Sequence, residues 1–242
     1  MHLPAVLPSA TLWYAFEASD AFGRTIVVIL FILSIYVWTI MIERGITMSR
    51  ARRAGRRFQE AFNQADAPLE LALRIEEFKG PLARVYMAGV DEVMDVLRVD
   101  PKLVDAYCRR RTLPRPLTPY EIDKVRTTVE RTVANELMRL ESRVGLVGTS
   151  VSLSPFLGLL GTVWGVLMTF CEMARLGRMD IEAVAPGVSG ALLTTVAGLF
   201  VAIPALIGYN LIVNSLQKST VEMDNFTDHF VALLKLESHE ER

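Results

Sequence analysis

Three threonine hydroxyls are the groups of this chain whose type and setting best suit chemistry. Thr162 lies within residues 144–171, a run without charged side chains, and Thr194 and Thr195 lie in a second such run, 183–217. A hydroxyl both donates and accepts, so it can offer a hydrogen bond to a pore water or to a carboxylate on another helix. The alternative is a bond to the carbonyl four residues earlier in the same helix, which is a purely structural outcome.

Neither run contains Asp, Glu, Lys, Arg or His. Conduction of protons or ions through a bilayer normally requires an ionisable group inside the membrane. If this protein conducts protons, the titrating residue must therefore come from a partner chain.

The same two runs carry stripes of small residues, spaced three or four apart. This spacing places them on one helix face and permits two helices to approach closely. Pro155 and Pro204 interrupt the runs, and we expect each to kink its helix. The residues expected to pack are Ser154, Gly158, Gly161 and Gly165 in the first run, and Gly187, Ala191, Gly198 and Ala202 in the second.

Each run exceeds the ~20 residues that a helix needs to cross a bilayer. Residues 25–43 form a third, mostly aliphatic stretch. A cleaved signal peptide is the alternative for this stretch, but residues 1–24 are not basic and no A-x-A site follows, so an uncleaved anchor is favoured.

Most of the 26 Lys and Arg residues fall between 44 and 143. The positive-inside rule then predicts an external N-terminus and a cytoplasmic C-terminus.

A helix start is predicted at Thr118, with Pro119 in the first helical position and Glu121 completing a capping box. An apolar stripe follows from Ile122 to Val144, and no breaker separates it from the second span. We therefore expect one continuous helix. Its stripe could be covered by residues 44–117 of the same chain or by a second copy.

These patterns predict an all-α integral membrane protein with three transmembrane helices and long cytoplasmic helical extensions. The expected order is an external segment (1–24), membrane helix 1 (25–43), a cytoplasmic helical loop (44–117), a long helix containing membrane helix 2 (118–174), an external loop (175–186), membrane helix 3 (187–213) and a cytoplasmic C-terminal helix (214–242).

No pattern for a metal, a cofactor or a catalytic centre is found in the sequence. The three histidines have no second ligand at helical spacing, and Cys108 and Cys171 are expected on opposite sides of the membrane. The arginine cluster after the first span suits anionic lipid headgroups better than nucleic acid. We thus expect a protein that is not an enzyme, binds no cofactor and contacts the lipid bilayer rather than nucleic acid.

Two segments carry a family resemblance: SPFLGLLGTVWGVLMTF (154–170) and APGVSGALLTTVAGLFVAIPALIGYN (185–210). They resemble the second and third spans of the MotA/TolQ/ExbB proton channel family, and its TolQ and ExbB branch most closely. The external side would then be the periplasm and the membrane the bacterial inner membrane. Close relatives often have a Glu where this chain has Gly190, so a carboxylate in the ring itself is not expected.

The resemblance implies a homo-oligomeric ring, a pentamer in the family, around single-span TolR- or ExbD-like subunits. The membrane Asp of that partner would carry the proton, and Thr162 and Thr195 would line its path. The complex would use the proton motive force to energise a Tol-Pal- or TonB-type process through a TolA- or TonB-like protein. The rival hypothesis is a non-conducting membrane scaffold or signalling component that oligomerises through its small residues.

Overall fold

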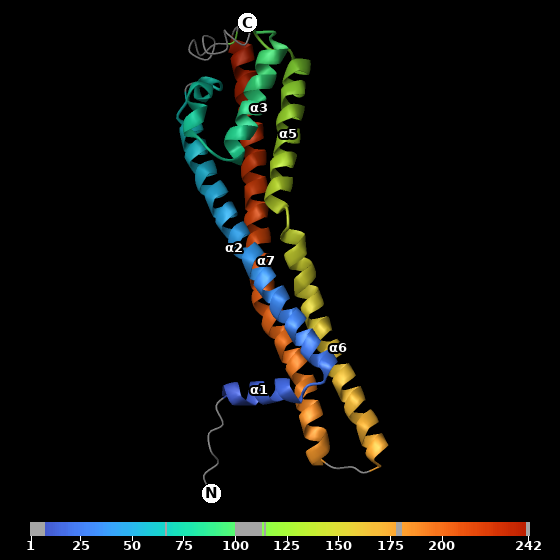
Figure 1. Ribbon diagram of the computed structural model, residues 1–242. Coiled ribbons are helices and arrows are strands. Elements are labelled where there is room, and N and C mark those ends of the chain that lie inside the picture. Colours follow the sequence, from blue (N-terminus) through green and yellow to red (C-terminus); the bar gives the residue numbers. More distant parts are fainter. Residues whose placement is uncertain (1–7, 66, 100–112, 114, 178–180, 241–242) are drawn as a thin grey trace. The chain divides into compact units, whose positions relative to one another are not determined.

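The computed structural model describes residues 8–65, 67–99, 113, 115–177 and 181–240, and in these it contains helices and no strands. Figure 1 shows their course. The helices are α1 (Pro8–Ala18), α2 (Ala21–Asn63), the 3₁₀ helix η1 (Glu70–Glu77), α3 (Pro81–Val96), α5 (Pro119–Glu141), α6 (Val144–Leu176) and α7 (Ile181–Glu240).

Three of these helices, α2, α6 and α7, are long and apolar enough to cross a membrane, with mean hydropathies of 2.6, 1.7 and 2.2 in their most apolar windows. They contain the three predicted spans. The chain is therefore an all-α membrane protein with three transmembrane helices, as its sequence predicts.

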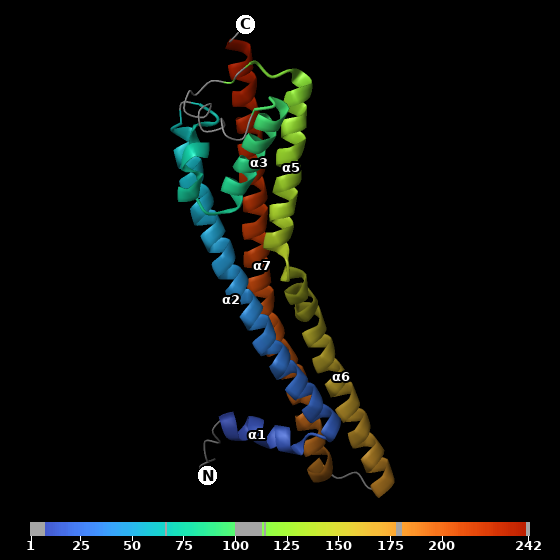
Figure 2. The same ribbon diagram turned by 45° about the horizontal axis from the view of Figure 1, so that its top comes forward.

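The first compact unit comprises the chain up to Glu43 and Arg143–Leu211, and it contains α6 with parts of α2 and α7. These helices run side by side in both views (Figures 1 and 2). Small apolar clusters hold them together. Ile26 and Leu30 pack on Val201, and a second cluster joins Val37, Ile40, Val147 and Ala205.

The outward faces of this unit are also apolar. Phe31, Phe156 and Phe200 are 66%, 68% and 81% exposed, respectively. Such side chains are stable in contact with lipid or with another apolar subunit, but not with water.

The second unit comprises Arg44–Ser142 and Ile212–Arg242. Its centre is a cluster of aromatic rings from α2, α3 and α7. Phe62 and Phe226 have ring centroids 5.0 Å apart, and Phe58 lies 5.3 Å from Tyr86. Phe230 is fully buried beside them. This is the packing expected of a water-soluble core, where aromatic burial contributes most of the cohesion.

The apolar stripe of α5 is covered by the same chain. Val125 and Val129 are fully buried, and α3 is the helix that packs along α5. Glu136 of the same helix, although charged, is only 3% exposed. It accepts hydrogen bonds from Arg84 Nε at 2.9 Å and from Arg139 at 2.8 Å, and this pairing makes its burial tolerable.

The prediction of one continuous helix over 118–174 is wrong. α5 ends at Glu141 and α6 begins at Val144. Between them Arg143 has a φ of +67°, a left-handed conformation that terminates a helix. The Ser142 hydroxyl donates to the carbonyl of Arg139 at 2.9 Å, so the side chain competes with continued helical bonding.

Two further boundaries differ from those predicted. α2 extends from the first span through the arginine cluster to Asn63, whereas the first membrane helix was expected to end at residue 43 and to be followed by a helical loop. α7 starts at Ile181 rather than 187 and includes Pro186, since a proline removes only one helical hydrogen bond near the start. Cys108 lies outside the described residues, whereas Cys171 is exposed on α6.

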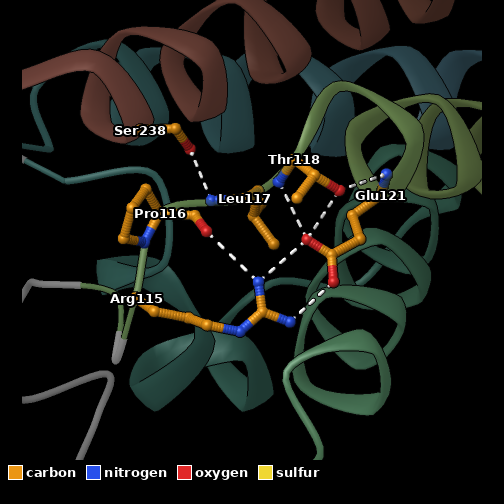
Figure 3. Close-up of polar contacts among 6 residues, drawn as sticks. All are labelled: Arg115, Pro116, Leu117, Thr118, Glu121 and Ser238. Atoms are coloured by element: carbon orange, nitrogen blue, oxygen red, sulfur yellow. Dashed lines mark hydrogen bonds and ion pairs between the residues drawn. The ribbon is translucent and has the colours of Figure 1, made fainter. Parts of the chain in front are cut away.

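The predicted capping box at the start of α5 is confirmed (Figure 3). The Thr118 hydroxyl accepts from the Glu121 N–H at 3.3 Å, and Glu121 accepts from the Thr118 N–H at 2.8 Å. Arg115 adds a two-pronged ion pair to the same carboxylate, at 2.6 and 2.9 Å. The Leu117 N–H donates to Ser238 near the end of α7, at 3.1 Å, so this turn is tied to α7.

The Arg115 guanidinium, followed by the Thr118 backbone, lowers the pKa of Glu121 from 4.5 to about 2. Because the folded-state pKa is lowered, ionised Glu121 stabilises the fold at pH values above its ordinary pKa, and this stabilisation is lost as the pH falls and the carboxylate becomes protonated.

We expect the melting temperature of the detergent-solubilised chain to fall as the pH is lowered from 4.5 to about 2. Glu121→Gln should lower stability at pH 7 and reduce this pH dependence. Tyr120→Phe, at an exposed position of the same turn, is the control, and an unchanged pH dependence in Glu121→Gln would contradict the assignment.

Candidate functional site: the hydroxyl cluster between α6 and α7

The backbones of α6 and α7 approach closely where both helices have glycine. A β-carbon added at Gly198 would lie 2.6 Å from the Ser154 carbonyl oxygen and 3.2 Å from the Gly158 Cα. One added at Gly158 would lie 2.8 Å from the Thr194 carbonyl oxygen. Since such distances are too short for real carbon atoms, only glycine permits this approach.

The contact continues along both helices. Gly161 packs on Thr194, whose Cβ would lie 2.7 Å from an added β-carbon, and Gly165 packs on Ala191 at the same distance. The predicted small residues of the two runs thus face each other in this region. Ser154 and Ala202 are buried, and Gly187 lies against Thr169.

This close approach brings three threonine hydroxyls to carbonyl groups of the opposite helix. Thr195 donates across to the Gly158 carbonyl at 3.0 Å, and Thr162 reaches the Ala191 carbonyl at 3.2 Å. Thr194 lies 3.0 Å from Gly158 O and 2.7 Å from Ala191 O. The hydroxyls of Thr162 and Thr195 are also hydrogen-bonded to each other.

Most other hydroxyls of α6 behave differently. Ser150, Ser154 and Thr169 each donate only to the carbonyl four residues earlier, at 2.7–2.8 Å. That is the structural outcome for a membrane hydroxyl. Thr162 also lies 3.2 Å from the carbonyl four residues earlier, Gly158 O, but Thr162 and Thr195 differ from these hydroxyls because they have additional bonds that cross between the helices.

The cluster has more donors than free acceptor positions. Each carbonyl has two lone pairs, and in a helix one of them accepts the backbone N–H four residues on. Gly158 and Ala191 therefore offer about one position each to three hydroxyl protons. With Thr194 closest to Ala191, one proton must lie between Thr162 and Thr195. Either hydroxyl can be its donor.

Burial divides the three threonines into two kinds. Thr194 is fully buried between the helices, whereas Thr162 and Thr195 are half-buried. The latter two residues therefore keep part of their surface outside the contact between the helices. The structure places all three predicted threonines in one cluster. Thr194 bridges the two helices, and the other two form a hydrogen-bonded hydroxyl pair on half-buried residues.

Sequence reasoning did not identify the Gly158 and Ala191 carbonyls as members of the site. They are backbone groups, so no residue type signals them; only the glycine spacing indicates where the carbonyls become accessible. Pro155 and Pro204 lie inside helices α6 and α7, and their kinks stay a prediction. Among the described residues no group of His, Cys, Asp and Glu could hold a metal ion.

Residues 81–225 match the family described as the MotA/TolQ/ExbB proton channel family. The Tol-Pal system protein TolQ of Haemophilus influenzae is 29% identical over 216 residues, covering 87% of this chain and 88% of its own. TolQ of Pseudomonas aeruginosa is 26% identical over 239 residues, covering 98% and 97%. The biopolymer transport protein ExbB of Pseudomonas putida is 30% identical over 204 residues, covering 84% of this chain and 57% of its own.

The helix crossing can be tested with two glycines of α6. Gly158→Ala should destabilise the detergent-solubilised chain by about 1–3 kcal/mol, because the methyl group meets opposing backbone. Gly145→Ala is the matched control, since an added β-carbon there has nothing within 4 Å. It should be neutral or stabilise by roughly 0.5–1 kcal/mol. Thermal unfolding measures both, and equal melting temperatures would show that α6 and α7 do not cross at Gly158.

Proposed function

The chain belongs to the MotA/TolQ/ExbB proton channel family, within its TolQ and ExbB branch, and we propose that it forms the wall of a proton-driven channel. In this proposal several copies surround the single membrane helix of a TolR- or ExbD-like partner. The partner supplies a membrane Asp, and this chain supplies the hydroxyls along which the proton travels.

The observation that carries the proposal is the half-buried pair formed by Thr162 and Thr195. The pair lies in runs without charged residues, where a hydroxyl can stabilise a partner carboxylate or receive its proton. Its shared proton has two possible donors, so accepting a proton on one side allows release on the other. No titratable group of these two spans is required.

The apolar outward faces of the first unit support assembly. Side chains such as Phe156 and Phe200 on different helices are largely exposed, and copies of the chain in a ring would cover part of that surface. We propose a ring of the family's kind, a pentamer, with the remaining apolar surface against lipid.

The charge distribution supports a location in the bacterial inner membrane. The arginine-rich end of the first span suits the cytoplasmic side, with the N-terminus in the periplasm and the C-terminus in the cytoplasm. We propose that the complex uses the proton motive force to do work on the periplasm or outer membrane, in a process of the Tol-Pal or TonB type, and the similarity to TolQ and ExbB proteins supports this proposal.

Thr195→Val and Thr162→Val test the relay, since valine keeps the shape and removes the hydroxyl. Losing a hydrogen bond to a charged group costs about 1.5–3 kcal/mol, so proton flux should fall roughly ten- to hundredfold. The measurement is acidification of liposomes containing the chain and its single-span partner, with liposomes lacking the partner as the blank. Thr195→Ser, which restores a hydroxyl, should recover most of the flux.

Assembly must be measured on the same variants, by mass determination of the complex in detergent. Intact complexes without flux support the relay. Loss of the complex in both valine variants would make these threonines packing residues, and full flux without any partner would contradict the division of labour. A wild-type complex that carries no proton at all would favour the scaffold.

A further inference from the structure

A cavity of about 410 Å³ lies within the first unit, lined by the corner between α1 and α2 and by parts of α6 and α7. Its charged lining residues are Glu17, Asp20, Arg24 and Glu172, and its apolar part includes Gly161, Gly165, Gly190 and Ala191. Elements α1, α2, α6 and α7 all contribute. Thr162 and Thr195 are not among the residues that line this cavity.

The corner between α1 and α2 forms one wall of the cavity and is firmly built. Asp20 caps α2 by accepting from the Gly23 N–H at 2.8 Å. The Arg24 side chain donates to the carbonyls of Phe16 and Glu17 at the end of α1. The wall therefore has a defined shape rather than being a loose terminus.

Asp20 is held from the opposite side by α6. Its Oδ2 accepts from the indole Nε1 of Trp164 at 2.9 Å, and the Phe22 ring packs on the same indole with centroids 4.7 Å apart. Both of its hydrogen-bond donors, the indole and the Gly23 N–H, are neutral. They orient the carboxylate without cancelling its charge.

The other charges around the cavity offset its carboxylates only in part. The Arg24 guanidinium keeps its charge, although the two carbonyls of α1 hold it in place, and Glu172 is paired with Arg175 at 2.6 Å. Glu17 adds a further carboxylate from α1. With Arg175 neutralising Glu172, Glu17 and Asp20 outnumber Arg24, so the lining carries one net negative charge and its local field favours cations.

The inner part of the cavity adjoins the hydroxyl cluster. Ala191 lines the cavity, and its carbonyl accepts from Thr162. Gly190 beside it has no side chain, and an added β-carbon would lie 2.8 Å from Ser19 Cα. The corner of α1 and α2 therefore occupies the space that a side chain at 190 would need. The cavity therefore has a charged wall and a wall of small residues, and Gly161 and Ala191 of the latter contact the threonine cluster.

We propose that this cavity is a water-filled vestibule that collects a hydrated monovalent cation, H₃O⁺ or Na⁺, beside the Thr162–Thr195 pair. Asp20 and Glu17 raise the local cation concentration, and Trp164 holds Asp20 in place. The inference that the vestibule feeds a channel rests on the proposed function. The inference that it holds water and attracts cations is independent of that function.

Thiol accessibility tests the vestibule without requiring conduction. In a full-length chain with Cys108→Ser and Cys171→Ser, Met168→Cys places a thiol in the cavity lining. Phe170→Cys is the matched control, because it is exposed on the same helix and is not among the cavity's lining residues. Membrane-bound protein is treated with cationic and anionic methanethiosulfonates of similar size.

The cationic reagent should react with residue 168 about tenfold faster than the anionic one, relative to the ratio at residue 170. Asp20→Asn should bring the cationic-to-anionic rate ratio at residue 168 close to the ratio at residue 170. Glu43→Gln, which removes a charge outside the cavity, should leave the cationic preference at residue 168 unchanged. If Asp20→Asn does not fold, Glu17→Gln is the substitute, because it should lower the cationic preference at residue 168 and leaves the Asp20 cap of α2 intact. Equal ratios at 168 and 170, or a thiol at 168 that neither reagent reaches, would overturn the vestibule.

Flux through the complex then tests its role and distinguishes the two cations. In liposomes with the single-span partner, a proton gradient and a sodium gradient are applied separately. Asp20→Asn should reduce flux of the ion that the wild type carries several-fold, with Glu43→Gln as the control. Unchanged flux would overturn the feeding role. A wild type that carries neither ion would instead overturn the proposed function and leave the thiol result standing.

Discussion

The close approach of α6 and α7 is the constraint on which the candidate site depends. Gly158 and Gly198 leave no side chain between the backbones, and only then can threonine hydroxyls reach carbonyls across the gap. Hydrogen bonding and packing are thereby satisfied together: each polar group in the crossing has a partner inside the protein, as an apolar surrounding demands. A single methyl group at the crossing would disturb both.

The two compact units use different sources of cohesion, each suited to its surroundings. The unit with the spans relies on small residues and interhelical hydroxyl bonds, because lipid supplies no hydrophobic drive between helices. The unit with α3 and α5 relies on buried rings such as Phe58 and Phe230 and on a paired, buried Glu136, because water does supply that drive. The composition of each segment therefore reflects its solvent.

Local sequence patterns predicted the three spans, the capping box at Thr118 and the location of the three threonines, because each depends on neighbours within a few residues. The break at Arg143 was not predictable: arginine carries no turn signal, and its left-handed conformation is imposed by the surrounding structure. The burial of Glu136 likewise depends on Arg84, which is 52 residues away. The space at Gly190 is filled by Ser19 from a distant segment, so its sequence neighbours gave no sign of the occupant.

The exchangeable donor in the Thr162–Thr195 pair has a consequence for direction. Two hydroxyls that can swap roles have no built-in polarity, and the segments of α6 and α7 that cross there carry no charged side chain. On the proposed function the hydroxyl pair by itself cannot act as a rectifier. The direction of proton flow would be decided by the electrochemical gradient and by the asymmetry of the single-span partner. Reversing the gradient would then drive protons along the same hydroxyls in the opposite direction.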